Sequence, residues 1–304
     1  MFTKPIVVIG SINMDLVART PRIPAAGETI TGSDFTTTPG GKGANQAVAV
    51  ARLGTHVQMI GAVGNDVFGE ALLSNLANAT VDTRAVAHIP GPSGVAQIQV
   101  ADNGQNSIVV VPGANGAVTP ALIRQHTNLI HSAGIVLLQL EIPLDTVLAA
   151  CELCAEAQVP VILDPAPAAP LHDAIWPQIA WFTPNETELG LYSGSGFPPE
   201  TAAKQLLARG VHGAVLKRGA EGVYIAASTG ESSWVPAFPV EAIDTVAAGD
   251  CFNGAFAVSL MEGNSPESAA RFASAAAAIS VTRRGAQTAM PTRAEVDAFL
   301  AEHA

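Results

Sequence analysis

Short runs of consecutive apolar residues, each followed by helical periodicity, recur along the chain and restrict its fold more than any other feature. Ile6–Ile9 is such a run, as are residues 135–140 and 159–163, and residues 144–158 have a helical pattern between the last two. Strands without polar alternation are typical of a sheet that is buried on both faces. Strands that alternate with helices are joined by right-handed crossovers. The sequence therefore predicts an α/β fold with a doubly wound, mostly parallel sheet flanked by helices.

Two further segments have the pattern of exposed strands. Residues 14–38 are rich in threonine and in apolar-polar alternation, with turn residues at 24–27 and 32–34. Residues 94–112 hold two more alternating runs, joined by an Asp-Asn-Gly turn. Alternation of this kind is typical of strands with one solvent-facing side. We expect the four strands to form a small antiparallel sheet outside the main fold, and the chain, 1–304, to be a single domain.

The composition limits the partners and the compartment of the protein. Its 304 residues are 48% hydrophobic, which is enough for a large core. Fifteen Lys and Arg stand against 26 Asp and Glu, a formal charge of −11; with no long basic run, nucleic acid is not an expected partner. No apolar run reaches the roughly 18 residues of a membrane span, and the N-terminus enters a strand without a charged leader. We expect a cytoplasmic protein with no membrane partner.

The three cysteines give no indication of a metal or redox site. Cys151 and Cys154 form a C-x-x-C motif, but they lie inside the helical pattern of residues 144–158, and no second pair exists. A tetrahedral zinc site needs further ligands. An odd number of cysteines in a chain of this length argues for a reducing compartment rather than a disulfide framework.

Residues 244–255, Asp-Thr-Val-Ala-Ala-Gly-Asp-Cys-Phe-Asn-Gly-Ala, are a turn of small residues that runs into an apolar helix. Phe252, Phe256 and Leu260 recur at four-residue spacing and place residues 247–250 at the helix N-terminus. The first N–H groups of a helix have no intrahelical partner, so small residues here let a phosphoryl group approach. Asp250 is then a candidate acceptor for a proton. A helix cap is the alternative that this segment alone leaves open.

A second glycine turn leads into a helix at residues 39–47, Pro-Gly-Gly-Lys-Gly-Ala-Asn-Gln-Ala. Apolar residues continue on one face of this helix until Gly54 ends it. Together the two turns resemble the motifs of the ribokinase-like family of sugar kinases. The resemblance runs from residues 10–15, Gly-Ser-Ile-Asn-Met-Asp, to residues 282–287, Thr-Arg-Arg-Gly-Ala-Gln, and so covers almost the whole chain.

The resemblance implies how the chemistry is divided among the residues of the first turn. Asp250 would accept the proton of the attacking hydroxyl, and the N–H groups of Ala247, Ala248 and Gly249 would hold the charge of the phosphoryl group in transfer. The family also implies a sugar site. The matching positions are Asn13, Asp15, Gly41, Lys42, Gly43, Asn45, Glu141 and Asp250.

Three of these polar residues follow predicted strands. Asn13 and Asp15 come after the first strand, and Glu141 ends another. Ligands of open parallel sheets bind beyond the carboxyl ends of the strands, and a charge there is costly to bury without a partner. An Asx turn is the alternative reading of Asn13 and Asp15.

The resemblance implies a site for ATP and magnesium. Asn185 and Glu188 match the N-x-x-E motif that organises magnesium and phosphates through water, although the same spacing is a capping box. Arg218 occupies a position that is usually apolar in the family. The nucleotide-binding positions implied are Asn185, Glu188, Lys217, Arg218, Gly219, Ala220, Glu221, Gly222, Gly249 and Ser274.

Family members also hold a potassium ion behind the anion turn. Most of the matching positions would supply backbone carbonyls, while Asp244 would supply charge. Ala289 is a departure, since close relatives carry serine there. The matching positions are Asp244, Val246, Ser280, Arg283, Gly285 and Ala289.

The activity that the resemblance implies is ATP-dependent phosphorylation of the 5-hydroxyl of D-ribose, in a homodimer joined through the small sheet, which would act as a lid over the sugar. A kinase of deoxyribose, of another sugar or of a nucleoside remains an alternative, as does a catalytically silent sugar-binding protein. A P-loop kinase is disfavoured because no G-x-x-x-x-G-K-[ST] occurs. A dehydrogenase is disfavoured because no G-x-G-x-x-G follows the first strand.

Overall fold

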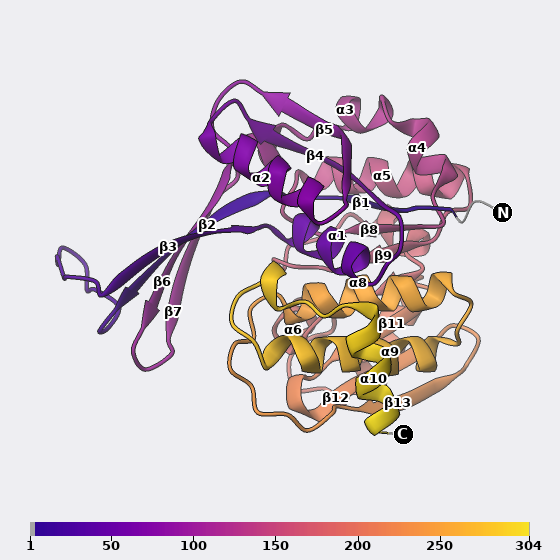
Figure 1. The fold of residues 1–304 in the computed structure, drawn as a ribbon. Helices are drawn as coiled ribbons and strands as arrows, with labels where there is room; N and C mark the ends of the chain where they lie inside the picture. The colour runs from indigo at the N-terminus through magenta and orange to yellow at the C-terminus, as the bar shows by residue number, and fades with distance from the viewer. Residues whose placement is uncertain (1–3, 304) are drawn as a thin grey trace.

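The computed structural model describes residues 4–303, in which a nine-stranded sheet is covered by helices on both faces (Figure 1). All pairings between β5 and β11 are parallel, and only the last two pairings, of β11 with β12 and of β12 with β13, are antiparallel. The predicted doubly wound, mostly parallel sheet is confirmed. In spatial order its strands are β13 (Ser232–Pro236), β12 (Gly222–Ala227), β11 (Gly213–Lys217), β10 (Trp181–Phe182), β9 (Val161–Leu163), β8 (Ile135–Leu138), β1 (Ile6–Ile9), β4 (Val57–Gly64) and β5 (Asp82–Ile89).

Side chains that alternate along the strands build two separate cores. Ile6 and Val8 of β1 belong to one hydrophobic cluster, and Val7 and Ile9 belong to the other, because successive strand residues point to opposite faces. The first face is covered by α1 (Lys42–Arg52), α2 (Val67–Asn78), α8 (Ala248–Met261), α9 (Pro266–Val281) and α10 (Arg293–Glu302). The second is covered by α3 (Pro120–Arg124), α4 (Thr127–Ser132), α5 (Leu144–Glu156), α6 (Glu186–Ser193) and α7 (Pro199–Ala208).

Short 3₁₀ helices connect several of these elements, and three of them, η1, η3 and η4, contribute residues to the site described below. They are η1 (Gly113–Ala117), η2 (Asp173–Gln178), η3 (Gly219–Glu221) and η4 (Gln287–Ala289).

Some element boundaries differ from the sequence prediction for local reasons. The sequence also predicts a helix over residues 70–76; in the structure this helix begins at Val67, because Asp66 caps it by accepting a hydrogen bond from Gly69 N at 2.8 Å. The run at 135–140 is strand only as far as Leu138, because the N–H of Leu140 donates to the Ala166 carbonyl instead of continuing the ladder.

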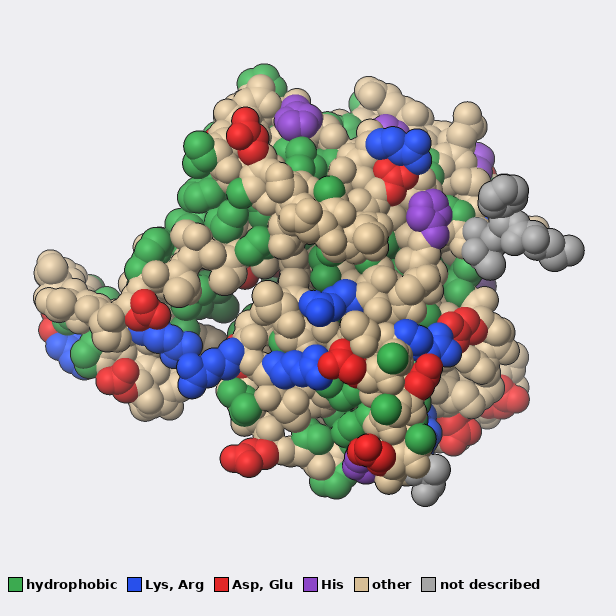
Figure 2. All heavy atoms as spheres, viewed as in Figure 1, with side chains coloured by type: hydrophobic (Ala, Val, Ile, Leu, Met, Phe, Trp, Pro, Cys, Tyr) green, Lys and Arg blue, Asp and Glu red, His purple; other side chains and the backbone are tan. Residues whose placement is uncertain are grey.

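The small sheet projects from the body as an arm (Figure 1). Its order is β3 (Asp34–Gly40), β2 (Asn13–Thr20), β6 (Gly94–Ala101) and β7 (Asn106–Val111). Both outer pairings are antiparallel, as predicted, and the central pairing of β2 with β6 is parallel. Figure 2 shows hydrophobic side chains gathered along this arm.

The sequence also makes predictions about membrane spans and about the cysteines. No helix within residues 4–303 is long and apolar enough to cross a membrane. Cys151 and Cys154 lie buried inside α5 as free thiols, and burial raises the pKa of the Cys154 thiol to about 12, a value at which it is unreactive at neutral pH.

Candidate active site

The two glycine turns of the sequence meet at Asp250, which lies in the first turn of α8 and is 4% exposed. Each carboxylate oxygen accepts a hydrogen bond from α1: Asn45 Nδ2 donates to Oδ2 at 2.9 Å, and Gln46 Nε2 donates to Oδ1 at 3.2 Å. The N-terminus of α8 has no side-chain cap. The alternative interpretation of Asp250 as a helix cap is therefore wrong.

The pKa of Asp250 suits a proton acceptor. Burial is the largest cause and, with the negative charges of Asp164 and Glu141, raises the pKa to about 6, while the Lys42 ammonium and the Asn45 hydrogen bond oppose the rise. A carboxylate with this pKa is mostly ionised at neutral pH and still basic enough to take a proton from a hydroxyl in transit.

The turn before α8 has the geometry of an anion site. Ala247 adopts the left-handed conformation, with φ of 59°, which costs a residue with a Cβ about 1–2 kcal/mol. A left-handed residue next to helical ones lets successive N–H groups form a concavity that binds anions. The N–H of Ala248, predicted to face the phosphoryl group, donates to the Thr245 carbonyl at 3.2 Å and is therefore engaged within the turn. A Cβ built on Gly249 would lie 3.5 Å from Lys217 Nζ, an ordinary van der Waals distance, so the ammonium lies beside the turn.

Where the resemblance implies a sugar site, Glu141 holds the start of α1 against the end of β1. Its Oε2 accepts hydrogen bonds from Ser11 Oγ, from Lys42 N at 3.1 Å and from Asn13 Nδ2 at 3.5 Å. Gly41 precedes α1 with φ of 89°, and a Cβ there would lie 2.7 Å from Asn13 N. Glycine is required at this close approach because another residue would collide with the backbone.

Asn13 and Asp15 lie at the start of β2 in the small sheet rather than in a loop after β1. Asn13 Oδ1 accepts a hydrogen bond from Asn115 Nδ2 at 2.7 Å, so the side chain is not engaged in an Asx turn. Burial, with the negative charges of Glu141 and Asp250, raises the pKa of Asp15 to about 7. Asp15 and Asn13 therefore face the same polar region as Asp250.

Lys42 supplies the positive charge that balances these acids. Burial lowers the pKa of its ammonium, but the surrounding carboxylates outweigh burial and hold the pKa above its ordinary value. The acids that act on it are Asp250, Asp164, Glu141 and Glu188.

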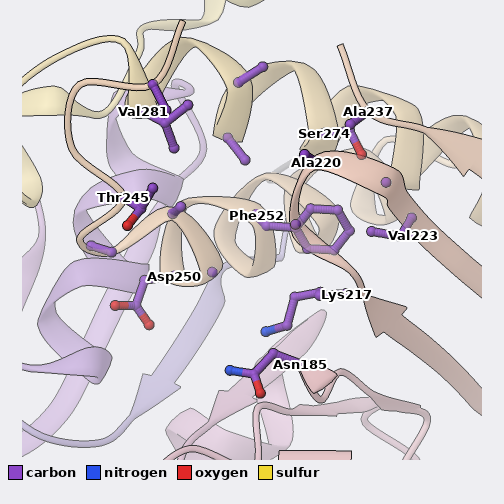
Figure 3. A pocket seen from close by; sticks show the side chains of 18 of the residues that line it. Asn185, Lys217, Ala220, Val223, Ala237, Thr245, Asp250, Phe252, Ser274 and Val281 are labelled. Carbon is purple, nitrogen blue, oxygen red and sulfur yellow. The ribbon is translucent and has the colours of Figure 1, made fainter. Parts of the chain in front are cut away.

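A cavity of about 820 Å³ opens from Asp250 toward α9. Its far end is apolar, with Val223, Phe252 and Val281 among the lining residues, whereas Lys217 and Asn185 lie near Asp250 (Figure 3). Pockets with apolar walls and a few converging polar groups are typical of small-molecule sites. The apolar end suits a flat base, and the polar end suits phosphates.

Lys217 is anchored at the polar end by a residue that the sequence reading did not assign. Its Nζ lies 3.0 Å from Asp164 Oδ1; the Asp164 side chain is buried, and that of Lys217 is 13% exposed. Asn185 and Glu188 form a complete capping box of α6, as the alternative interpretation predicted. Both side chains also line the cavity, so the cap does not exclude a second role.

Only part of the loop at residues 217–222, which the resemblance implies for nucleotide binding, reaches the cavity. Gly219, Ala220 and Gly222 line it, as does Ser274 of α9. Arg218 and Glu221 do not, because Arg218 pairs with Glu221 at 2.8 Å and with Glu186 at 3.2 Å.

The positions proposed for potassium lie on two adjoining segments. Asp244 Oδ1 accepts from Val246 N at 3.0 Å, and Oδ2 accepts from Gly285 N at 2.9 Å. Arg283 N donates to the Ser280 carbonyl at 3.2 Å. Ala289 is fully buried in η4. Within residues 4–303, no group of three or more His, Cys, Asp or Glu is placed to hold a metal ion.

The sequence reading missed several polar residues of the site. Asp164 could have been found, because it ends a buried strand just as Glu141 does. Gln46 lies inside the recognised glycine motif. Ser11 and Gln287 also lie inside recognised motifs, at residues 10–15 and 282–287, whereas Asn115 had no local pattern that would separate it from an ordinary turn residue.

Comparison with known proteins agrees with this geometry. A model of the pfkB family of carbohydrate kinases matches residues 3–293. The chain belongs to this kinase family. The ribokinase of Bacillus subtilis (strain 168) is 46% identical over 300 residues, covering 98% of this chain and 99% of that protein. The deoxyribokinase of Salmonella typhi is 36% identical, covering 97% and 98%. The structure of Arabidopsis thaliana ribokinase complexed with ribose and ATP superposes with a TM-score of 0.93 at 34% identity, covering 98% of this chain and 99% of that one.

Proposed function

We propose that the protein transfers the γ-phosphoryl group of ATP to the 5-hydroxyl of D-ribose, giving ribose 5-phosphate and ADP. The observation that supports this proposal is a buried carboxylate, Asp250, that lies between the polar side chains of α1 and a cavity with one polar and one apolar end. The 5-oxygen forms a bond to the γ-phosphorus while the bond from that phosphorus to the β,γ-bridging oxygen breaks, and the hydroxyl proton passes to Asp250. Phosphoryl transfer of this kind depends mainly on positioning and charge stabilisation.

The sugar would be held where the lid meets the body. Asp15, Asn45 and Glu141 offer oxygen and N–H groups to its hydroxyls, and the resemblance assigns the same role to Asn13, Gly41, Lys42 and Gly43. The ionised Asp15 carboxylate has lone pairs for two hydroxyl donors. A small polyhydroxylated sugar fits this set better than a nucleoside does.

ATP would lie in the cavity with its phosphates near Lys217 and the turn at Ala247 to Gly249. Asn185 and Glu188 would hold Mg²⁺ through water, and their carboxamide and carboxylate oxygens are ligands that Mg²⁺ accepts. When bound, the ion neutralises phosphate charge. The protein's own contribution is to place Lys217 and the N–H groups against the same phosphates.

A potassium ion would lie behind the anion turn, between the segments that Asp244 connects. Asp244 fits the role because its carboxylate is drawn to both segments by Val246 N and Gly285 N. When bound, the ion fixes the carbonyls of the turn. Ala289 supplies no hydroxyl to this cage, and a water molecule would take that place.

The lid would also join two copies of the chain. Four consecutive residues of β7, Ile108 to Val111, are each at least 44% exposed, and Phe35 of β3 is 62% exposed. Apolar side chains on the edge strands of a sheet invite pairing unless another surface covers them. We propose that the lid of a second copy is that surface.

A panel of acceptors tests the proposed substrate. D-ribose, 2-deoxy-D-ribose and adenosine are compared by kcat/KM for ADP release. A site that bonds the 2-hydroxyl should favour ribose by about 10²-fold or more, because the analogue leaves a polar group unpaired. Equal activity with deoxyribose would favour the alternative function, a deoxyribose kinase. The similarity to the deoxyribokinase supports that alternative. Release of no ADP with any acceptor would favour a silent sugar-binding protein.

A further inference from the structure

We propose that Gln287 and Gln139 are positioning residues for Asp250: each fixes the orientation of the side-chain amide that donates to one of its two carboxylate oxygens. The inference rests on the proposed role of Asp250 as proton acceptor. Neither glutamine touches Asp250, and each acts through one intermediate amide, Asn45 or Gln46.

The first chain of amides starts at the loop between α9 and α10. Gln287, which is 7% exposed, donates from Nε2 to Asn45 Oδ1 at 3.0 Å. Its own orientation is set because Oε1 accepts from Asn75 Nδ2 at 2.6 Å. Arg52 Nη1 holds its backbone carbonyl at 3.1 Å. With its oxygen bound to Gln287, Asn45 must turn its nitrogen toward Asp250.

The second chain starts in the segment after β8. Gln139 is fully buried and donates from Nε2 to Gln46 Oε1 at 2.7 Å. Gln46 Nε2 then donates to Asp250 Oδ1 and, at 3.1 Å, to Asp164 Oδ2. A Cβ on Gly10 would lie 2.0 Å from Gln139 Oε1. The glycine after β1 therefore makes the space in which Gln139 lies.

Both chains run in the same direction, with every N–H group directed toward Asp250. Amides aligned in this way polarise one another, and each hydrogen bond in the chain becomes stronger. A reversed Asn45 or Gln46 would present an oxygen to the carboxylate and repel its charge. Gln287 selects the donating orientation of Asn45 by binding its oxygen. At Gln46, Gln139 binds the oxygen and adds to the orienting effect of Asp164, which accepts from the nitrogen. Each Asp250 oxygen also keeps a lone pair for the hydroxyl of the substrate.

The charges around Asp250 make this orientation important. Lys42 favours the anion, whereas burial and the neighbouring Asp164, Glu141 and Asp15 disfavour it. The two donated N–H groups help to keep the carboxylate ionised. Losing one of them shifts the balance toward the protonated form, which cannot accept a proton.

The test uses Gln287→Met and Gln139→Met, which remove the amide but keep a long unbranched side chain. Gln58→Met is the matched control, because Gln58 also donates from a partly buried amide to a carboxylate, Asp82 at 3.0 Å, in the pairing of β4 with β5. We measure kcat for ribose phosphorylation from pH 5 to 9, the KM for ATP, and the Tm of each protein. The expected result is a shift of the acid limb of kcat to higher pH by about one unit, equivalent to a tenfold change in the ionisation equilibrium. The KM for ATP and the profile of Gln58→Met should not change.

The outcomes separate this inference from the proposed function. A loss of kcat by the same factor at every pH would mean that the glutamines are only structural and would overturn the inference, as would wild-type profiles in both variants. If Gln287→Met does not fold, the profile of Gln139→Met decides in the same way. Asp250→Asn serves as the reference: if it stays active, the role of Asp250 itself fails, and if it is inactive while both glutamine variants behave as wild type, only the present inference fails.

Discussion

The affinity for ribose should depend on pH through Asp15. This carboxyl group is 9% exposed, and burial together with Glu141 and Asp250 raises its pKa to about 7 from the ordinary 3.8. The ionised form accepts hydrogen bonds from sugar hydroxyls through both oxygens, and the protonated form has given up part of that capacity. Ribose should therefore bind to the ionised form and pull the pKa of Asp15 down.

The size of the effect follows from the fraction of Asp15 that is ionised. With a pKa of about 7, the dissociation constant scales as 1 + 10^(7 − pH), so it is larger at pH 6 than at pH 8 by 11/1.1, or about 10-fold. The dissociation constant can be measured by isothermal titration calorimetry with ribose alone, at constant ionic strength from pH 6 to 8. Asp15→Asn is the matched variant, because it keeps the shape and removes the titration.

Two results would refute this reasoning. The first is a wild-type affinity that stays flat between pH 6 and 8. The second is an Asp15→Asn variant that retains the tenfold dependence. A further consequence concerns stability: because the folded-state pKa lies above the unfolded value, the native protein binds the extra proton between about pH 4 and 7, and stability falls as pH rises through this window. Without ligand, Asp15→Asn should lack this fall, and its Tm should exceed that of the wild type at pH 8.

Three other predictions concern the nucleotide, the cation and the lid. Lys217→Met should raise the KM for ATP by about 10-fold or more while the ribose affinity stays unchanged, and should lower Tm because buried Asp164 loses its partner; equal losses for both ligands would indicate a damaged fold instead. Potassium should activate the enzyme more than sodium does, and the wild type should need a higher potassium concentration for half-maximal activity than Ala289→Ser does. Full activity in potassium-free protein would show that no potassium site is needed. Identical activation curves for the two proteins would show that Ala289 has no effect. Val109→Asp should shift the mass measured by light scattering from dimer to monomer, because a charge would enter the covered surface; a wild-type monomer would contradict the proposed lid contact.

Much of the fold could be predicted because it rests on local patterns. The apolar runs that became β1, β8 and β9 are buried on both faces, and that burial is what removes polar alternation from a strand. The glycine turns could also be located from the sequence, because the close approach of the backbone at Gly41 excludes residues with a side chain. The parallel pairing of β2 with β6 could not be predicted from the sequence, since it depends on how the main sheet and its helices position two segments that are far apart in the chain.

The parts of the site that escaped prediction are held by long-range contacts. Asn115 bonds to Ile12 across 103 positions, and Gln287 bonds to Asn45 across 242. A single amide in a loop has the same local pattern whether it faces solvent or an active site. Asp15 shows the same limit in another way: its elevated pKa arises from Glu141 and Asp250, which only the folded chain brings near it.

Turnover by Asp250→Asn tests the central claim most directly. The substitution keeps the size of the side chain and removes the group that would accept the hydroxyl proton. The account predicts that kcat for ADP release with ribose falls by about 10²-fold or more, while the affinities for ATP and ribose change little, as expected for loss of a general base. Turnover close to that of the wild type would contradict it, because Asp250 would then serve only to join α8 to α1.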